Sequence, residues 1–358
     1  DVYTDEVKDS VAQYGDAAIV TLSRVGGEGA DLSYGEVNYL ALDENEKAML
    51  QNVAEMKKNG IVKKTIVLIN SANALQVDFL KNNEYDIDAA LWIGDVGISG
   101  INAVAEILTG KVNPSGSLVD TYCYDNFSAP AMWNFTPTTY EGYVEGGDVS
   151  AKAKSYMIYQ EGIYVGYKYY ETRYEDFVTG NGNAGDYAYG DIVAYPFGYG
   201  LSYTTFTQKM SDITNDGSSL KFSVTVTNTG SAAGKDVVEI YNDPPYTNGG
   251  IEKASAYLLD FAKTSELAPG ESETIDFTIP VEDLASYDYK NNGCYVLEAG
   301  DYIISTNSDS HNVLDSKTYT VASDIVYNES NKRESDAVAA TNQFDFAEGE
   351  ITYLSRAD

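Results

Sequence analysis

The sequence is poor in the residues on which several kinds of chemistry depend. Its 358 residues include one histidine, two cysteines and 23 Lys+Arg against 55 Asp+Glu, which gives a formal net charge of −32. With His311 as the single histidine, a histidine-rich metal cluster is excluded and a Ser-His-Asp relay has little scope. A surface this acidic repels phosphate backbones and anionic lipid headgroups, so neither nucleic acid nor a membrane is an expected partner. Carboxylate chemistry is what remains.

Few features of the sequence indicate a compartment. Cys123 and Cys294 lie far apart and are interpreted as two free thiols, not as a disulfide framework. No run approaches the ~20 apolar residues that a membrane-spanning helix needs. Residues 1–16 lack the basic start and apolar core of a signal peptide, and they begin abruptly, as a processed or truncated end would. The localisation therefore stays open, with the cytoplasm slightly favoured over secretion, and so does the oligomeric state, a homodimer included.

The first part of the chain has the pattern of an α/β fold with a largely parallel sheet. Short apolar runs at residues 18–23, 65–70 and 89–93 predict strands. Residues 43–59 carry apolar side chains at helical spacing, with acidic residues early and lysines late, as the helix macrodipole favours. Residues 101–109 predict a second helix, which Gly110 terminates.

The later part of the chain switches to a period of two. From Leu220 onward, short runs of alternating apolar and polar residues are separated by Gly, Asn and Pro turns. This pattern predicts an antiparallel β-sandwich. The expected strands span residues 221–228, 236–241, 273–279 and 300–305.

These changes of pattern predict the domain organisation. An α/β domain over residues 1–135 is followed by an extended Tyr- and Gly-rich connection over 136–204, packed on the α/β domain. The β-sandwich covers 205–325, and residues 326–358 form a linker. Four tyrosines of the connection would serve either as a ligand-stacking platform or in interdomain packing, and packing is favoured because interdomain packing is the commoner use of such aromatics. They are Tyr164, Tyr167, Tyr169 and Tyr170.

The candidate active segment is the loop over residues 24–31, which directly follows the first predicted strand. In an open α/β sheet, ligands bind outside the carboxyl ends of the strands. Three glycines around Glu28 let the chain turn tightly and allow a substrate close to the carboxylate, which burial would convert into a general acid. On local sequence alone, a glycine-rich acidic surface loop is the favoured interpretation. A phosphate cradle ranks last, because the loop lacks the lysine-serine pair of a Walker motif.

A resemblance changes that weighting. Six motifs follow one another along the chain: GGEGAD at 26–31, VLINS at 67–71, LWIGDVG at 91–97, NPSG at 113–116, EGIYVGYKYY at 161–170 and YPFGYGLSY at 195–203. In this order they resemble the second and third domains of glycoside hydrolase family 3, which contains many β-glucosidases and β-xylosidases. In that family an α/β sandwich precedes a fibronectin type III-like domain, which VTVTNTG at 224–230 and LAPGE at 267–271 resemble. The expected fold class is therefore an α/β sandwich followed by an antiparallel fibronectin type III-like β-sandwich.

The resemblance implies roles for three residues of the loop. Glu28 corresponds to the general acid/base of a retaining mechanism, which protonates the glycosidic oxygen and later activates water. Arg24 and Asp31 flank it and are expected either to orient the loop or to line the outer sugar site, with structural ion pairing as the alternative. No metal and no organic cofactor is implied.

The resemblance also implies a part that these residues do not supply. A retaining glycosidase needs a second carboxylate about 5 to 5.5 Å from the first, and family members carry it as an aspartate on a (β/α)8 barrel. The tail GEITYLSRAD at 349–358 resembles the entry into that barrel. We therefore expect a member with permuted domain order, in which the sandwich and the fibronectin-like domain precede the barrel and residues 326–358 lead to it.

Two functions follow from this interpretation. The first is part of an exo-acting β-glycosidase acting on a β-glucoside or oligosaccharide, with β-glucosidase favoured over β-xylosidase and β-galactosidase. The barrel of the same enzyme is then the partner, and the isolated chain is inactive. The alternative is a non-catalytic carbohydrate-binding or scaffolding module. Glu28 distinguishes them, because a binding module has no need of a glutamate without a counter-charge at the end of a strand.

Overall fold

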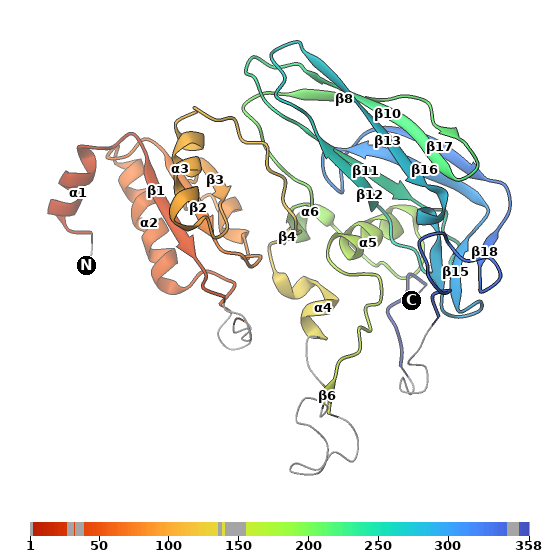
Figure 1. The fold of residues 1–358 in the computed structure, drawn as a ribbon. Helices are drawn as coiled ribbons and strands as arrows, with labels where there is room; N and C mark the ends of the chain where they lie inside the picture. Colours follow the sequence, from red (N-terminus) through yellow and green to blue (C-terminus); the bar gives the residue numbers. More distant parts are fainter. Residues whose placement is uncertain are drawn as a thin grey trace. The chain divides into compact units, whose positions relative to one another are not determined.

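The computed structural model describes residues 3–26, 32, 39–134, 138–139, 155–341 and 351–357, which divide between two compact units (Figure 1). Unit 1 comprises residues 1–112, 121–126 and 191–195, and unit 2 comprises residues 113–120, 127–190 and 196–358. Within these described ranges, no helix is long and apolar enough to cross a membrane. The two cysteines, both described and both buried, are not joined by a disulfide.

Unit 1 is built on a three-stranded parallel sheet in the order β1-β2-β3 (Figure 1). The strands are β1 (Ala18–Ser23), β2 (Thr65–Asn70) and β3 (Ala89–Trp92), which confirms the three predicted strands to within one residue. The helices are α1 (Asp5–Ala12), α2 (Glu44–Lys58) and α3 (Gly97–Leu108). Shorter elements are η1 (Asp78–Lys81) and the antiparallel pair β4 (Tyr122–Cys123) and β7 (Val193–Tyr195).

Local sequence accounts for both predicted helices of unit 1. In α2, Asp43 and Glu46 form a capping box, with Asp43 Oδ1 accepting from the Glu46 N–H at 2.8 Å. Its apolar face buries Leu50 and Met56, so the prediction of a helix at 43–59 is confirmed. Helix α3 begins four residues before the predicted start, because glycines at 97 and 100 weaken the helical signal of its first turn.

Unit 2 is dominated by the predicted antiparallel sandwich. One sheet has the order β13-β10-β8, with β9 beside β10, and the other has the order β12-β11-β16-β17 (Figure 1). A small third sheet has the order β14-β15-β18. The strands are β8 (Phe206–Met210), β9 (Thr214–Asn215), β10 (Ser219–Asn228), β11 (Val237–Asp243), β12 (Tyr257–Lys263), β13 (Ser272–Pro280), β14 (Ser286–Asp288), β15 (Cys294–Leu297), β16 (Gly300–Asn307), β17 (Val313–Val321) and β18 (Ile325–Tyr327), with the turn η4 (Val281–Leu284) after β13.

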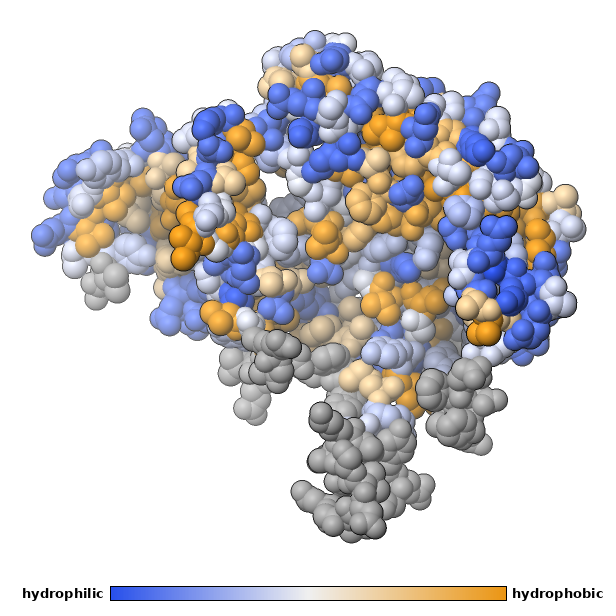
Figure 2. Space-filling view, in the orientation of Figure 1, coloured by the Kyte–Doolittle hydropathy of each residue, from blue (hydrophilic) through white to orange (hydrophobic). Residues whose placement is uncertain are grey.

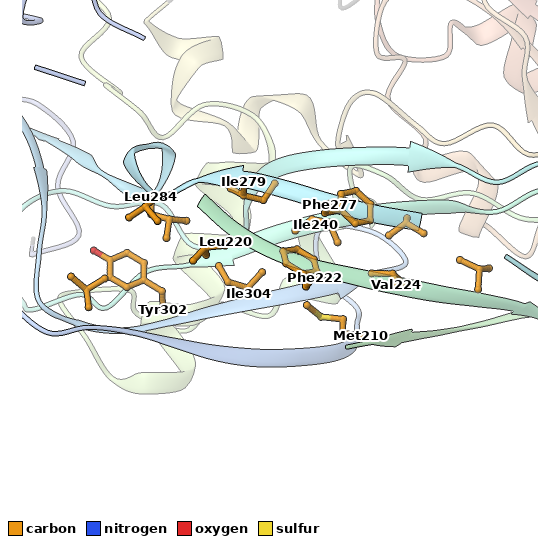
Figure 3. Packing of buried hydrophobic residues seen from close by; sticks show 14 of the residues in the cluster. Met210, Leu220, Phe222, Val224, Ile240, Phe277, Ile279, Leu284, Tyr302 and Ile304 are labelled. Atoms are coloured by element: carbon orange, nitrogen blue, oxygen red, sulfur yellow. The ribbon is translucent and has the colours of Figure 1, made fainter. Parts of the chain in front are cut away.

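The core of the sandwich forms from the inward residues of the two large sheets. Along β10 buried residues alternate with less buried ones, and its pairing with β13 places Phe222 opposite Phe277, whose rings stack at 5.7 Å between centroids. Ile240 and Ile304, which are fully buried, come from the other sheet (Figure 3). The apolar residues that alternate with polar ones in the sequence are therefore the residues that face this core. On the visible outer surface, hydrophilic residues are interspersed with hydrophobic ones (Figure 2).

The segment 136–204 differs from its prediction. We expected an extended connection, but its described part contains helix α5 (Tyr167–Thr179) and the short helix α6 (Tyr189–Ile192), and most of the segment groups with the sandwich in unit 2. Helix α5 was not predicted, because its buried positions include the polar residues Glu171, Thr172 and Asp176 and so form no apolar stripe in the sequence. The remaining elements of the segment and its approach are η2 (Asn126–Ser128), α4 (Pro130–Trp133), β5 (Thr138–Thr139) and β6 (Ser155–Tyr156).

The clustered tyrosines lie in unit 2 and pack against other residues of that unit, whereas packing between domains was expected. Tyr164 and Tyr170 are buried, each with 3% of its surface exposed. The Tyr167 ring stacks on Phe197 with 4.5 Å between centroids, and its hydroxyl accepts a hydrogen bond from the Leu258 N–H at 3.1 Å. These tyrosine side chains therefore pack against residues of unit 2.

Candidate functional site

The carboxyl edge of the unit 1 sheet is the predicted location of the site. Because β1, β2 and β3 are parallel, their carboxyl ends at Ser23, Asn70 and Trp92 lie along one edge. The ladder continues past the strand ends, since the Arg24 N–H donates to the Asn70 carbonyl at 3.2 Å and the Ile93 N–H to the Ile69 carbonyl at 2.9 Å. The loop with the candidate acid therefore starts from a fixed backbone.

Two of the three predicted site residues, Glu28 and Asp31, lie outside the described residues. The described beginning of their loop, Arg24 to Gly26, runs close to Asn73 in the loop after β2. A Cβ placed on Gly26 would lie 2.8 Å from Asn73 Oδ1, so only glycine fits there without displacing that side chain. Asn73 is itself held by Ser71, whose Oγ donates to the Asn73 carbonyl at 2.9 Å.

Arg24 is buried, and every N–H group of its guanidinium has a partner inside unit 1. Nη1 and Nη2 donate to the two carboxylate oxygens of Glu46 at 2.7 and 2.8 Å, a bidentate ion pair. The same two atoms also donate to the carbonyls of Ser23 at 2.8 Å and Ala41 at 2.7 Å. Nε donates to the carbonyl of Tyr39, whose ring lies 5.2 Å from the guanidinium carbon.

The structural ion pair considered for Arg24 is therefore present. Its fork ties residues 39–46 to the end of β1 and leaves no donor for a ligand. Such an arginine acts on a neighbouring loop by positioning the backbone from which the loop starts. Asp31 lies outside the described residues, and its contact with a sugar stays a prediction.

Sequence analysis did not single out Trp92 as a site residue. Its indole Nε1 donates to the Ser71 carbonyl at 2.8 Å, and 37% of the residue is exposed. A partly exposed aromatic ring therefore lies at the same sheet edge as the start of the candidate loop. The signal that could have found it is the position of an aromatic residue at the end of a parallel strand.

A second concentration of polar side chains lies in unit 2, around the segment 351–357. Arg356 is buried and donates to Asp176 Oδ1 from Nε at 2.9 Å and from Nη2 at 2.6 Å. It also donates to Glu175 at 2.9 Å and to the Lys253 carbonyl at 2.9 Å, and its guanidinium carbon lies 4.0 Å from the centroid of the Tyr246 ring. The segment is thus docked on α5 and on the loop before β12.

Further contacts hold the same segment. Glu252 accepts from Ser355 Oγ at 2.6 Å, from the Arg356 N–H at 3.2 Å and from the Tyr164 hydroxyl at 2.6 Å. Gly182, at φ +52°, allows the Arg356 carbonyl a close approach, since a Cβ there would lie 1.8 Å from that oxygen. Sequence analysis assigned residues 326–358 to a linker, and the partners of Arg356 could not be read from its sequence because they lie about 100 to 180 residues away.

Burial raises the pKa of several carboxyl groups in unit 2, and two of them, Glu239 and Asp243, are raised to about 7. Desolvation raises the pKa of Glu239 to about 7, with the Tyr241 hydroxyl donating to it at 2.7 Å. Desolvation and the neighbouring Glu175 likewise raise the pKa of Asp243 to about 7. The Glu239 carboxyl is covered by the main chain at Gly198, where a Cβ would lie 2.2 Å from Oε2. It is therefore closed off by the fold and is not placed to meet a substrate.

Comparison with known proteins identifies both domains. Residues 3–167 match the glycosyl hydrolase family 3 C-terminal domain, and residues 236–310 match the fibronectin type III-like domain. The chain belongs to glycoside hydrolase family 3. The resemblance noted in the sequence and the expected fold class, an α/β domain followed by a β-sandwich, are thereby confirmed.

Several similar proteins are named β-glucosidases. A β-glucosidase of Ruminococcus albus is 32% identical over 99% of this chain and 34% of its own length, and β-glucosidase A of Butyrivibrio fibrisolvens is 33% identical over 90% and 39%. Among solved structures, β-glucosidase 3B from Thermotoga neapolitana in complex with α-D-glucose has a TM-score of 0.72 and 32% identity, over 90% of this chain and 40% of that one. The chain thus spans about a third to two fifths of these glycoside hydrolase family 3 proteins.

Proposed function

We propose that this chain is part of a retaining, exo-acting β-glycosidase, with β-glucosidase as its specificity and Glu28 as its general acid/base. In the first step the Glu28 carboxyl gives its proton to the glycosidic oxygen while a second carboxylate bonds to the anomeric carbon and the C–O bond breaks. In the second step the Glu28 carboxylate takes a proton from the water that attacks that carbon, and the bond between the carbon and the second carboxylate breaks, which releases the sugar and restores both carboxyl groups. Terminal non-reducing β-linked sugars are the substrates.

The main support for this proposal is the position of the GGEGAD loop, which follows β1 at the carboxyl edge of a parallel sheet in a family 3 C-terminal domain. Similar proteins named β-glucosidases, one of them solved with glucose, support the sugar specificity. Arg24 contributes as a positioning residue, because its contacts fix the backbone at the start of the loop. Asp31 is proposed to contact the outer sugar.

The nucleophile is proposed to lie on a (β/α)8 barrel outside these 358 residues. The described parts of the chain contain no eight-stranded parallel barrel, and the parallel sheet of unit 1 has three strands. A permuted order, with the barrel after the segment 351–357, is proposed because residues 349–358 resemble the entry into that barrel.

Hydrolysis of a chromogenic β-glucoside tests the proposal. We expect activity in the full gene product, none in the 358-residue chain alone, and a loss of about 10²- to 10⁴-fold in the full-length Glu28→Gln variant on a substrate whose leaving group needs protonation. With an activated aryl glucoside, azide should restore turnover of Glu28→Gln and yield the β-glucosyl azide, the product of a retaining enzyme that has lost its acid/base.

Glu266→Gln is the matched control, because Glu266 is an exposed glutamate of the β-sandwich, and it should retain full activity. An inactive full product, or a Glu28→Gln variant as active as its parent, would overturn the proposal. In the first case the non-catalytic carbohydrate-binding module becomes the better account of the chain.

A further inference from the structure

Unit 2 contains a pocket of about 360 Å³ that the proposed catalytic reaction does not use. Three stretches of chain form it: the end of α4, residues 160–161 after β6, and the docked segment near the C-terminus. This volume lies at the lower end of the range for small-molecule sites. The pocket is lined by Pro130, Asn134, Gln160, Glu161, Thr352, Tyr353, Leu354 and Ser355.

A buried carboxylate without a cation is the most telling group in this lining. Glu161 is 6% exposed, and Asn134 Nδ2 donates to its Oε2 at 2.9 Å. No ion pair joins Glu161 to a basic side chain among the described residues, in contrast to the carboxylates around Arg356. Buried carboxylates are costly unless their oxygens receive hydrogen bonds, so a ligand that donates to Glu161 gains a strong contact.

The rest of the lining decides what kind of ligand fits. Asn134 already donates both of its amide N–H groups, to the Ile158 carbonyl at 2.7 Å and to Glu161 at 2.9 Å, so Gln160 is the amide of the lining that can donate to and accept from a ligand. A carboxylate beside such an amide favours a ligand whose groups both donate and accept over an ammonium or guanidinium, which only donates. Pro130, Tyr353 and Leu354 supply an apolar surface in the same pocket. A pyranose ring has this combination of properties, since its hydroxyls donate and accept while its C–H face packs on apolar and aromatic side chains.

The wall formed by the segment 351–357 is held in place by contacts on both sides of the pocket. The Leu354 N–H donates to the Gln160 carbonyl at 2.8 Å, which joins this wall to the residue before Glu161. Ser355 donates to Glu252, and Arg356 anchors the next position to α5. The pocket is therefore preorganised by the fold, which lowers the entropic cost of binding.

We infer that this pocket is a binding site for a neutral pyranose, with Glu161 accepting hydrogen bonds from sugar hydroxyls and Tyr353 and Leu354 packing on the ring. The choice of a sugar over other polyhydroxylated ligands rests on the proposed function. The site itself does not involve Glu28, so it gives the 358-residue chain an affinity for sugar that is independent of hydrolysis.

Titration of the 358-residue chain with D-glucose and with methyl β-D-glucoside, followed by NMR of the labelled protein, tests the inference. We expect saturable binding with a Kd of about 1 to 10 mM and shifts in the amide signals of Gln160, Glu161 and Ser355. Glu161→Gln should weaken binding about tenfold or more. The exposed Glu266→Gln should bind as the parent does.

A second variant covers the case in which Glu161→Gln does not fold. Thr352→Trp places a large side chain at an exposed lining position and should abolish binding by filling the pocket without disturbing the core. No saturable sugar binding, binding unchanged in both pocket variants, or binding of ethylammonium in place of glucose would overturn the inference. Sugar binding by a chain whose full-length product lacks glycosidase activity would overturn the proposed function alone.

Discussion

The buried carboxyl of Glu239 makes the stability of unit 2 depend on pH in a direction opposite to that of a salt-bridged acid. Its pKa is raised from 4.5 to about 7, first by desolvation, against which the hydrogen bond from Tyr241 acts, and also by the nearby Asp309 and Asp236. Between these two pH values the unfolded carboxyl is ionised while the folded one keeps its proton. The folded state then binds more protons, so its stability falls as pH rises.

The size of the effect follows from the two pKa values. At pH 8 the difference between about 7 and 4.5 corresponds to about 3 kcal/mol of lost stability, and at pH 5 to under about 1 kcal/mol. Glu239→Gln removes the titration and keeps an oxygen that accepts from the Tyr241 hydroxyl. We therefore expect this variant to stabilise unit 2 by about 3 kcal/mol at pH 8 and to have little effect at pH 5.

Urea unfolding of parent and variant at both pH values, followed by near-ultraviolet circular dichroism, measures this difference. Asp243 also has a raised pKa and titrates in both proteins, so the comparison between them isolates Glu239. Glu266→Gln, at an exposed position, is the control and should track the parent at both pH values. A Glu239→Gln variant whose stability falls with pH in parallel with the parent would refute the reasoning, as would one that is destabilised at pH 8.

Two further predictions concern the buried arginines. Arg356→Ala leaves the carboxylate of Asp176 buried without its cation and should destabilise unit 2 by about 3 to 5 kcal/mol. Arg356→Lys should recover only part of this stability. A loss no larger than that of the exposed Lys63→Ala control would contradict the prediction. Arg24→Lys keeps the charge beside Glu46 but loses the planar fork, and should lower the urea stability of unit 1 by about 1 to 3 kcal/mol; an unchanged midpoint would show that the fork is dispensable.

Local patterns in the sequence were sufficient for the three strands of unit 1, for several strands of the sandwich and for helices α2 and α3. The alternation along residues 219–228 and the capping box at Asp43 are properties of near neighbours in the chain, and the structure has β10 and α2 at those places. The order of short motifs likewise resembled the family that the two domain matches show.

Polar residues inside the fold were not predictable in the same way. Helix α5 buries Glu171, Thr172 and Asp176, and each is acceptable there because distant groups satisfy it. Asp176, for instance, meets Arg356, which is 180 residues further along the chain. A pattern of hydrophobicity cannot register such a helix, since its buried face is polar.

The sequence by itself thus determined the two-part fold, the loop that carries Glu28 and the scarcity of histidine and of positive charge. Tertiary structure alone decided that Arg24 donates all its hydrogen bonds to carbonyls and to Glu46, that Arg356 binds to α5, and that Glu161 lines a pocket. The physical reason is the range of the forces. Backbone preferences act between neighbours, whereas desolvation and charge pairing depend on which distant segments the fold brings to the same place.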